Sequence, residues 1–186
     1  THLPEHKFVS GQPETGGDLA DDLERIASNF GPENIAACIV EPIAGSTGTL
    51  VPPKGYLQRL REICDKHGIL LIFDEVITGW GRTGSSFASH EFGVTPDLMT
   101  MAKATTNGVV PMGVVACKDE IYDAVMDASP MGSVELFHGY TYSGIPVAVA
   151  AGLAVQDIFE KEDIFNRAKN LAPYFQKGLF SLQDLE

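Results

Sequence analysis

Two continuous apolar runs restrict the folds that this chain can adopt. IAACIVE at 35–41 and ILLIFD at 69–74 show no alternation of polar and apolar residues before their final carboxylate. Strands of this kind are typical of parallel sheets, in which both faces are buried. Shorter runs at 97–102 and 112–118 predict two further strands. The sequence therefore predicts an α/β fold whose sheet is parallel or mostly parallel and covered by helices.

Apolar residues at helical spacing occupy the segments between and after these runs. Asp18 is expected to cap the first helix, and Gly68 is expected to end the second. Pro173 should kink the last amphipathic segment or start a new helix there. The expected helices cover these ranges: 18–30, 56–67, 119–127, 146–160 and 162–185.

Charge and composition exclude several classes of function. The formal net charge of −12 argues against binding to nucleic acid or to anionic membrane surfaces. No apolar run approaches the length of a membrane span, and no spacing of metal ligands is present. The three cysteines, Cys38, Cys64 and Cys117, are far apart in the sequence and are expected to be small buried residues. A cytoplasmic protein is the simplest interpretation.

Three charged residues fall at or just beyond the ends of predicted strands. Glu41 ends the run at 35–41, Asp74 ends the run at 69–74, and Lys103 follows the run at 97–102. Because ligands of parallel sheets bind at the carboxyl ends of the strands, these residues are expected to meet at one edge. A lysine amine can form an imine with an aldehyde cofactor, and a carboxylate can keep a pyridine nitrogen protonated.

Other interpretations of these residues stay open at this point. An apolar strand ending in Asp74 and Glu75 also resembles the magnesium-binding strand of nucleotide hydrolases, but the chain has no G-x-x-x-x-G-K-[ST] loop. Asp74 could simply cap the next turn, and most lysines are solvated. The apolar residues around Lys103, including Met101 and Val109, instead predict a partly desolvated amine with a lowered pKa.

The segments LLIFDEVITGWGRTG (70–84) and AKATTNGVVPMGVV (102–115) resemble those of the class III pyridoxal-phosphate-dependent aminotransferases. They look most like the branch that moves amino groups from ω-amino acids such as β-alanine to pyruvate. The resemblance runs from about Pro4 to the end. It implies a fold-type-I major domain over residues 1–161 and the start of a small C-terminal domain over 162–186. It also implies an internal fragment of a longer chain.

The resemblance further implies roles for individual residues. Lys103 would form the imine with pyridoxal 5'-phosphate, and Asp74 would contact the pyridine nitrogen. Val76 would pack under the cofactor ring, and Glu41 would lie near the rim of the site. Within FHGYTYSGIP at 137–146, Thr141 would reach the cofactor phosphate of a neighbouring subunit. The protein is thus expected to be a homodimer or a dimer of dimers.

Departures from the family pattern bear on the substrate. Ala104 follows the lysine where glycine is usual, and Ser46 and Thr47 occupy a region where many relatives have glutamate. The latter change favours pyruvate over a dicarboxylate as the amino acceptor, in a ping-pong reaction with an amine donor. Trp80 and Arg82 could border the substrate, although Arg82 could equally serve an interface. The alternatives are another class III enzyme, such as an aminomutase or a different ω-aminotransferase, and an inactive fragment.

Overall fold

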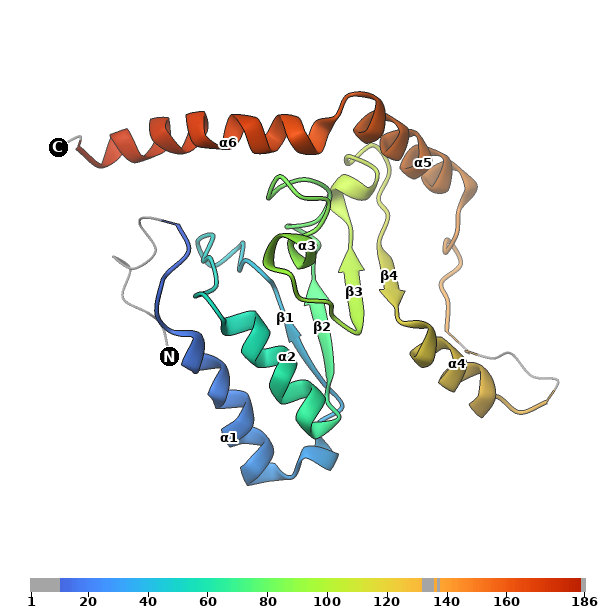
Figure 1. The fold of residues 1–186 in the computed structure, drawn as a ribbon. Coiled ribbons are helices and arrows are strands. Elements are labelled where there is room, and N and C mark those ends of the chain that lie inside the picture. Colours follow the sequence, from blue (N-terminus) through green and yellow to red (C-terminus); the bar gives the residue numbers. More distant parts are fainter. Residues whose placement is uncertain (1–10, 132–135, 137, 185–186) are drawn as a thin grey trace.

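Four strands form one sheet in the computed structural model, which describes residues 11–131, 136 and 138–184. The strands lie in the order β1-β2-β3-β4. The first three are parallel and β4 is antiparallel to β3, which confirms the mostly parallel α/β fold (Figure 1). Their bounds are β1 Ala37–Val40, β2 Leu70–Asp74, β3 Leu98–Met101 and β4 Val114–Cys117.

The described residues also form six α-helices, which precede, connect and follow the strands: α1 Asp21–Phe30, α2 Tyr56–His67, α3 Ala88–Phe92, α4 Asp119–Ala128, α5 Pro146–Lys161 and α6 Ile164–Phe180. Gly68 ends α2 in the left-handed conformation, with φ 68°, as predicted. The prediction for Asp18 is wrong. It lies inside a 3-10 turn, Gly17–Ala20, that leads into α1, and its side chain forms no capping bond. Pro173 lies within α6 and does not start a new helix.

The main core lies between one face of the sheet and the helices α1 and α2. In Figure 1 the two helices run side by side, with α2 in front of β1 and β2. Alternate residues of β2, Leu71 and Phe73, point into this core and are fully buried. From α2, Leu57, Leu60 and Cys64 meet them. The apolar spacing of the helix and the apolar strand therefore bury the same interface from two sides.

The opposite face of the sheet is exposed over β1 and β2. Ile39 is 62% exposed, and Leu70 and Val115 are also exposed. The prediction that the run at 35–41 is buried on both faces is therefore wrong for this structure, because α1 and α2 both pack on the other side. Cys117 is exposed as well, so it is not the buried residue that was expected.

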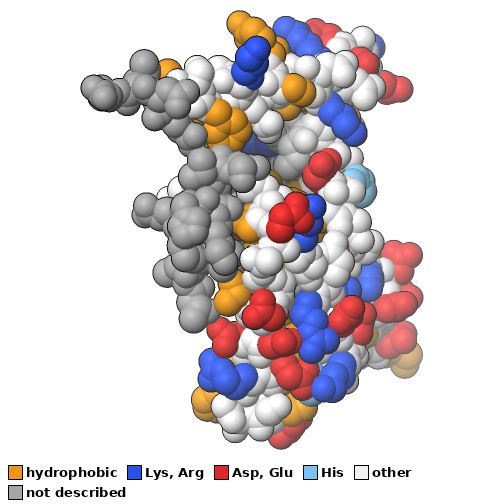
Figure 2. Space-filling model, turned by 60° about the vertical axis from the view of Figure 1, so that its left-hand side comes forward, with side chains coloured by type: hydrophobic (Ala, Val, Ile, Leu, Met, Phe, Trp, Pro, Cys, Tyr) orange, Lys and Arg blue, Asp and Glu red, His pale blue; other side chains and the backbone are white. Residues whose placement is uncertain are grey.

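Acidic and basic side chains are interspersed over the surface that α1 and α2 present in Figure 2. Arg59 contacts Asp21 at 2.7 Å, and Lys66 contacts Glu24 at 2.7 Å, so ion pairs join the two helices. Exposed pairs of this kind contribute little to stability, because solvent screens the charges. Within the part of the chain that is described, no helix is long and apolar enough to cross a membrane.

Asp97, just before β3, joins three elements of the fold. Its carboxylate accepts hydrogen bonds from the Leu71 backbone N–H at 2.7 Å and from Arg61 at 2.8 Å, and it contacts Lys118 at 2.7 Å. Burial alone would raise the pKa of Asp97, but these three donors outweigh it, so the pKa lies below its usual value. The ionised carboxylate therefore holds β2, α2 and the end of β4 together.

Replacing Asp97 with asparagine should destabilise the chain by about 2–3 kcal/mol, since the amide leaves the nearby cations incompletely paired. The pKa of Asp97 is lower in the folded state. The stabilisation of the fold by ionised Asp97 is thus present above its unfolded-state pKa of about 4, and it is lost as the pH falls through its folded-state pKa. Urea unfolding measured from pH 3 to 7 should therefore show that the stability of Asp97→Asn falls less at acid pH than the stability of the wild type. Asp21→Asn, which removes an exposed pair, is the matched control, and equal effects of both would contradict this account.

Candidate active site

The carboxyl ends of β1, β2 and β3 bring the predicted site residues to one edge of the sheet. Glu41 directly follows β1, Asp74 ends β2, and Lys103 is the second residue after β3. Val40 lies opposite Phe73 in the parallel register, so Glu41 and Asp74 follow as neighbours at the edge. This confirms the expectation that residues far apart in sequence meet at one rim.

Asp74 is half-buried, and its Oδ1 accepts a hydrogen bond from the backbone N–H of Val76 at 3.0 Å. No described residue donates a hydrogen bond to Oδ2. Because neighbouring strand residues alternate, Asp74 points to the face opposite Phe73, where Thr100 is its partner on β3. The carboxylate is therefore oriented by its own turn and retains one free acceptor on the open face of the sheet.

Glu75 has a different role, which the sequence did not reveal. Its side chain is fully buried. It accepts hydrogen bonds from the Thr78 hydroxyl at 2.6 Å and from the backbone N–H groups of Ala88 and Ser89 at 2.9 and 2.7 Å. These are the first N–H groups of α3, which favour a negative charge. Of the two adjacent carboxylates, Glu75 thus holds the loop together and Asp74 is left for other chemistry.

Lys103 begins a 3-10 turn, Lys103–Thr105, in an uncommon backbone conformation with φ 46°. A residue other than glycine in the left-handed region costs about 1–3 kcal/mol, and such strain clusters at functional sites. The side chain is exposed, so the expected partial desolvation is not found among the described residues. Met101 and Thr105 on either side of the lysine are buried, but Val109 is 75% exposed, so it does not shield the amine as predicted.

Trp80 connects the loop after β2 to the turn that carries Lys103. Its indole N–H donates to the Thr105 hydroxyl at 3.0 Å, and that hydroxyl donates to the Ala102 carbonyl at 3.0 Å. The indole lies near Phe87 and Phe159, with centroids 4.9 and 6.1 Å away. Its polar atom is therefore used within the protein, which the sequence interpretation of Trp80 as a residue bordering substrate did not anticipate.

A cavity of about 560 Å³ lies on the same face of the sheet as Asp74. Val76 and Thr100 line it from the strand ends, and Tyr140, Tyr142 and Ser143 line it from the loop before α5. The Ser143 N–H donates to the Tyr140 carbonyl at 2.9 Å, which closes a turn in that loop. The structure thus brings the loop before α5 to the ends of β2 and β3, next to Asp74 and Lys103.

Of the five predicted site residues, only Val76 lines this cavity. Asp74 lies two residues before Val76, and Lys103 directly follows Ala102, which also lines the cavity. Thr141 is exposed on the same turn, and Glu41 has its Oε2 occupied by the Gly45 N–H at 2.9 Å. Phe137, the first residue of the motif at 137–146, lies outside the described residues. Thr141 therefore lies on the loop that lines the cavity, and its contact with a cofactor stays a prediction.

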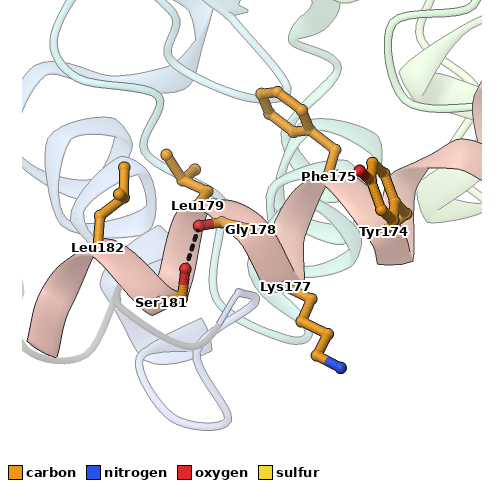
Figure 3. A pocket seen from close by; sticks show the side chains of 7 residues that line it. All are labelled: Tyr174, Phe175, Lys177, Gly178, Leu179, Ser181 and Leu182. Atoms are coloured by element: carbon orange, nitrogen blue, oxygen red, sulfur yellow. Dashed lines mark hydrogen bonds between the residues drawn. The ribbon is translucent and has the colours of Figure 1, made fainter.

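A second cavity, of about 570 Å³, lies along α6 and the turn after it, far along the chain from these motifs. Figure 3 shows Phe175, Leu179 and Leu182 projecting to one side of the helix, with Lys177 on the other. The Ser181 hydroxyl, just after α6, donates a hydrogen bond to the Gly178 carbonyl of that helix at 2.7 Å. This face offers apolar contact and no arrangement of reactive groups, so the edge with Asp74 and Lys103 is the better candidate site.

The fold places the chain in the transaminase class of α/β proteins. The solved (S)-enantioselective ω-transaminase of Thermomicrobium roseum superposes with a TM-score of 0.85 at 40% identity, covering 98% of this chain and 38% of that one. A structure described as a transaminase with L-alanine gives a TM-score of 0.88 at 36% identity, covering 100% of this chain and 44% of that one.

The chain belongs to the class-III aminotransferase family, whose model matches residues 3–186. It is 60% identical over 185 residues to an omega-aminotransferase of Caulobacter vibrioides, covering 99% of this chain and 42% of that protein. It is 56% identical to a beta-alanine–pyruvate aminotransferase of Pseudomonas aeruginosa, covering 98% and 41% respectively. The chain therefore spans about two fifths of the length of these relatives.

Proposed function

We propose that the intact protein is a pyridoxal-phosphate-dependent aminotransferase that transfers an amino group from an ω-amino acid of the β-alanine type to pyruvate. The observation that carries the proposal is the meeting of Asp74 and the strained Lys103 turn at one edge of the sheet, beside the cavity lined by Val76. The similarity to beta-alanine–pyruvate aminotransferase supports the choice of substrates.

The residues at this edge fit the proposed cofactor. Pyridoxal phosphate presents a ring nitrogen, an apolar ring face, an aldehyde and a phosphate. Asp74 has an oxygen that accepts no bond from a described residue, Val76 offers an apolar surface in the cavity, and the Lys103 amine is exposed. Hydroxyl and backbone N–H groups around Tyr140–Gly144, just before α5, suit a phosphate.

The bound cofactor would supply an electron sink for the negative charge that develops on the substrate carbon. Asp74 would keep the ring nitrogen protonated, because a nearby carboxylate favours the cationic form. The Lys103 amine would hold the cofactor and would take up and return the proton at the substrate carbon. Val76 would fix the ring, and Glu41 would border the rim beside Asp74.

We also propose the domain and subunit arrangement expected from the sequence. Residues 1–161 would form part of the cofactor-binding major domain, and residues 162–186 would begin the small domain. In Figure 1, α6 extends beyond the sheet, and its Leu171, Tyr174 and Phe175 are exposed. The exposed position of Thr141 suits a contact with the phosphate of a neighbouring subunit in a homodimer.

A panel of donors and acceptors tests the proposed substrates in the intact protein. We expect kcat/KM for pyruvate, with β-alanine as donor, to exceed that for 2-oxoglutarate by at least about tenfold. The physical reason is that Ser46 and Thr47, both exposed, provide no carboxylate to control a dicarboxylate-binding arginine. Formation of alanine from pyruvate is the measurement. A preference for 2-oxoglutarate would contradict the proposal. A marked preference for a diamine donor such as putrescine would instead support a different ω-aminotransferase.

A further inference from the structure

We propose that Trp80 and Thr105 are positioning residues for Lys103, acting through the hydrogen bond between the indole N–H and the Thr105 hydroxyl. The inference rests on the proposed function, in which Lys103 holds the cofactor. It assigns to the single tryptophan of the chain a role in placing the lysine amine.

Thr105 closes the turn that carries the lysine. It is 4% exposed. Both its backbone N–H and its hydroxyl donate to the carbonyl of Ala102, each at 3.0 Å. Ala102 directly precedes Lys103, so these bonds fix the peptide at the start of the strained residue. The hydroxyl can bond Ala102 in this way while its lone pair accepts the Trp80 N–H at 3.0 Å.

Trp80 is itself held from several sides. Its backbone, with φ 62°, donates from N–H to the Ser86 carbonyl at 2.6 Å. Its ring packs near Phe87 from the same loop and Phe159 from α5. The loop is anchored in turn by Glu75, whose carbonyl accepts the Gly79 N–H at 2.9 Å. A rigid loop that starts beside Asp74 therefore reaches across to the Lys103 turn.

This connection matters because Lys103 is in a conformation that its neighbours must maintain. Without the bond from Trp80, the Thr105 hydroxyl could rotate away from Ala102 and the turn could relax. Relaxation of φ toward the right-handed region would displace the long side chain relative to Asp74. A displacement of about 1 Å at a reacting group can cost up to roughly 100-fold in rate. The hydrogen bond thus links the two halves of the candidate site.

The test uses the intact protein and the variants Trp80→Phe, Thr105→Val, Thr105→Ser and the double variant Trp80→Phe/Thr105→Val. Phenylalanine retains a ring between Phe87 and Phe159 but removes the N–H. Valine removes the hydroxyl at nearly constant shape, and serine retains it. Each variant is first checked for a native circular dichroism spectrum. Measurements are kcat and KM for β-alanine and pyruvate, and the pH midpoint of the absorbance of the bound cofactor.

We expect kcat to fall about tenfold in Trp80→Phe and in Thr105→Val, which corresponds to about 1.4 kcal/mol, with KM changed by less than about twofold. The kcat of the double variant should lie within about twofold of the kcat of either single variant, because all three variants remove the same hydrogen bond. Thr105→Ser should stay within about threefold of wild type. The absorbance midpoint should shift in the same direction in Trp80→Phe and Thr105→Val.

Additive losses in the double variant, an unchanged kcat, or an unmoved absorbance midpoint would overturn the inference. If Trp80→Phe fails to fold, Thr105→Val compared with Thr105→Ser decides the same question, since both retain the tryptophan. Borohydride reduction of the wild type separates the two proposals. A cofactor attached to Lys103 together with additive losses overturns only the positioning role, whereas no cofactor at Lys103 overturns the proposed function as well.

Discussion

Replacing Lys103 with alanine is expected to lower kcat of the intact protein by at least about 10⁴-fold, or about 5.5 kcal/mol in the activation free energy. In our account the amine both holds the cofactor and moves the proton at the substrate carbon, and alanine can do neither. Because the Lys103 side chain is exposed, its loss should change the unfolding temperature by no more than about 2 °C. Steady-state formation of alanine from pyruvate measures the effect.

The matched control for this variant is Lys161→Ala. Lys161 lies at the end of α5, where its ion pair with Asp157 at 3.6 Å is exposed and worth little. Its removal should leave kcat within about twofold of wild type. Turnover of Lys103→Ala at a level similar to this control would show that the lysine at the strand end is not the reactive amine.

Replacing Asp74 with asparagine should slow the half-reaction with the amine donor by at least about 100-fold. The side chain keeps its shape, and its carbonyl oxygen can still accept the Val76 N–H. It loses the negative charge that would favour a protonated ring nitrogen. Single-turnover rates with β-alanine isolate this step from product release. Cofactor should remain bound, because Lys103 and the loop at Tyr140–Gly144 are unchanged.

Asp157→Asn is the control for Asp74, since it removes an exposed carboxylate from α5. A change of less than about tenfold in the single-turnover rate of Asp74→Asn, equivalent to about 1.4 kcal/mol, would mean that the charge on Asp74 has no catalytic role. A loss of native structure at this position would point instead to a structural role like that of Glu75.

The sequence correctly predicted the helices and strands that are determined by residues close together in the chain. β2 forms before Asp74 because its first four residues are all apolar, and two of them, Ile72 and Phe73, are β-branched or aromatic. The helix at 56–67 was predicted to the residue, because its apolar stripe ends at a glycine that can adopt a positive φ. The meeting of Glu41, Asp74 and Lys103 followed from the rule that parallel strands share a carboxyl edge.

Features that depend on contacts between distant segments could not be predicted in this way. Periodicity does not tell which face of β1 lies beneath α1 and α2, so the exposure of Ile39 was missed. No pattern distinguishes Glu75 from Asp74, yet the alternation of the backbone buries one and leaves the other at the edge. The bond from Trp80 to Thr105 joins residues 25 positions apart and has no signature in the sequence.

Mapping the site of cofactor attachment tests the central claim most directly. The intact protein is incubated with pyridoxal phosphate, reduced with borohydride, digested and examined by mass spectrometry. The account predicts close to one modification per chain, located on the peptide that contains Lys103, and none there when a saturating amine donor is added before reduction. Attachment at another lysine, such as the exposed Lys161, or no stoichiometric attachment, would contradict the assignment of this edge of the sheet as the active site.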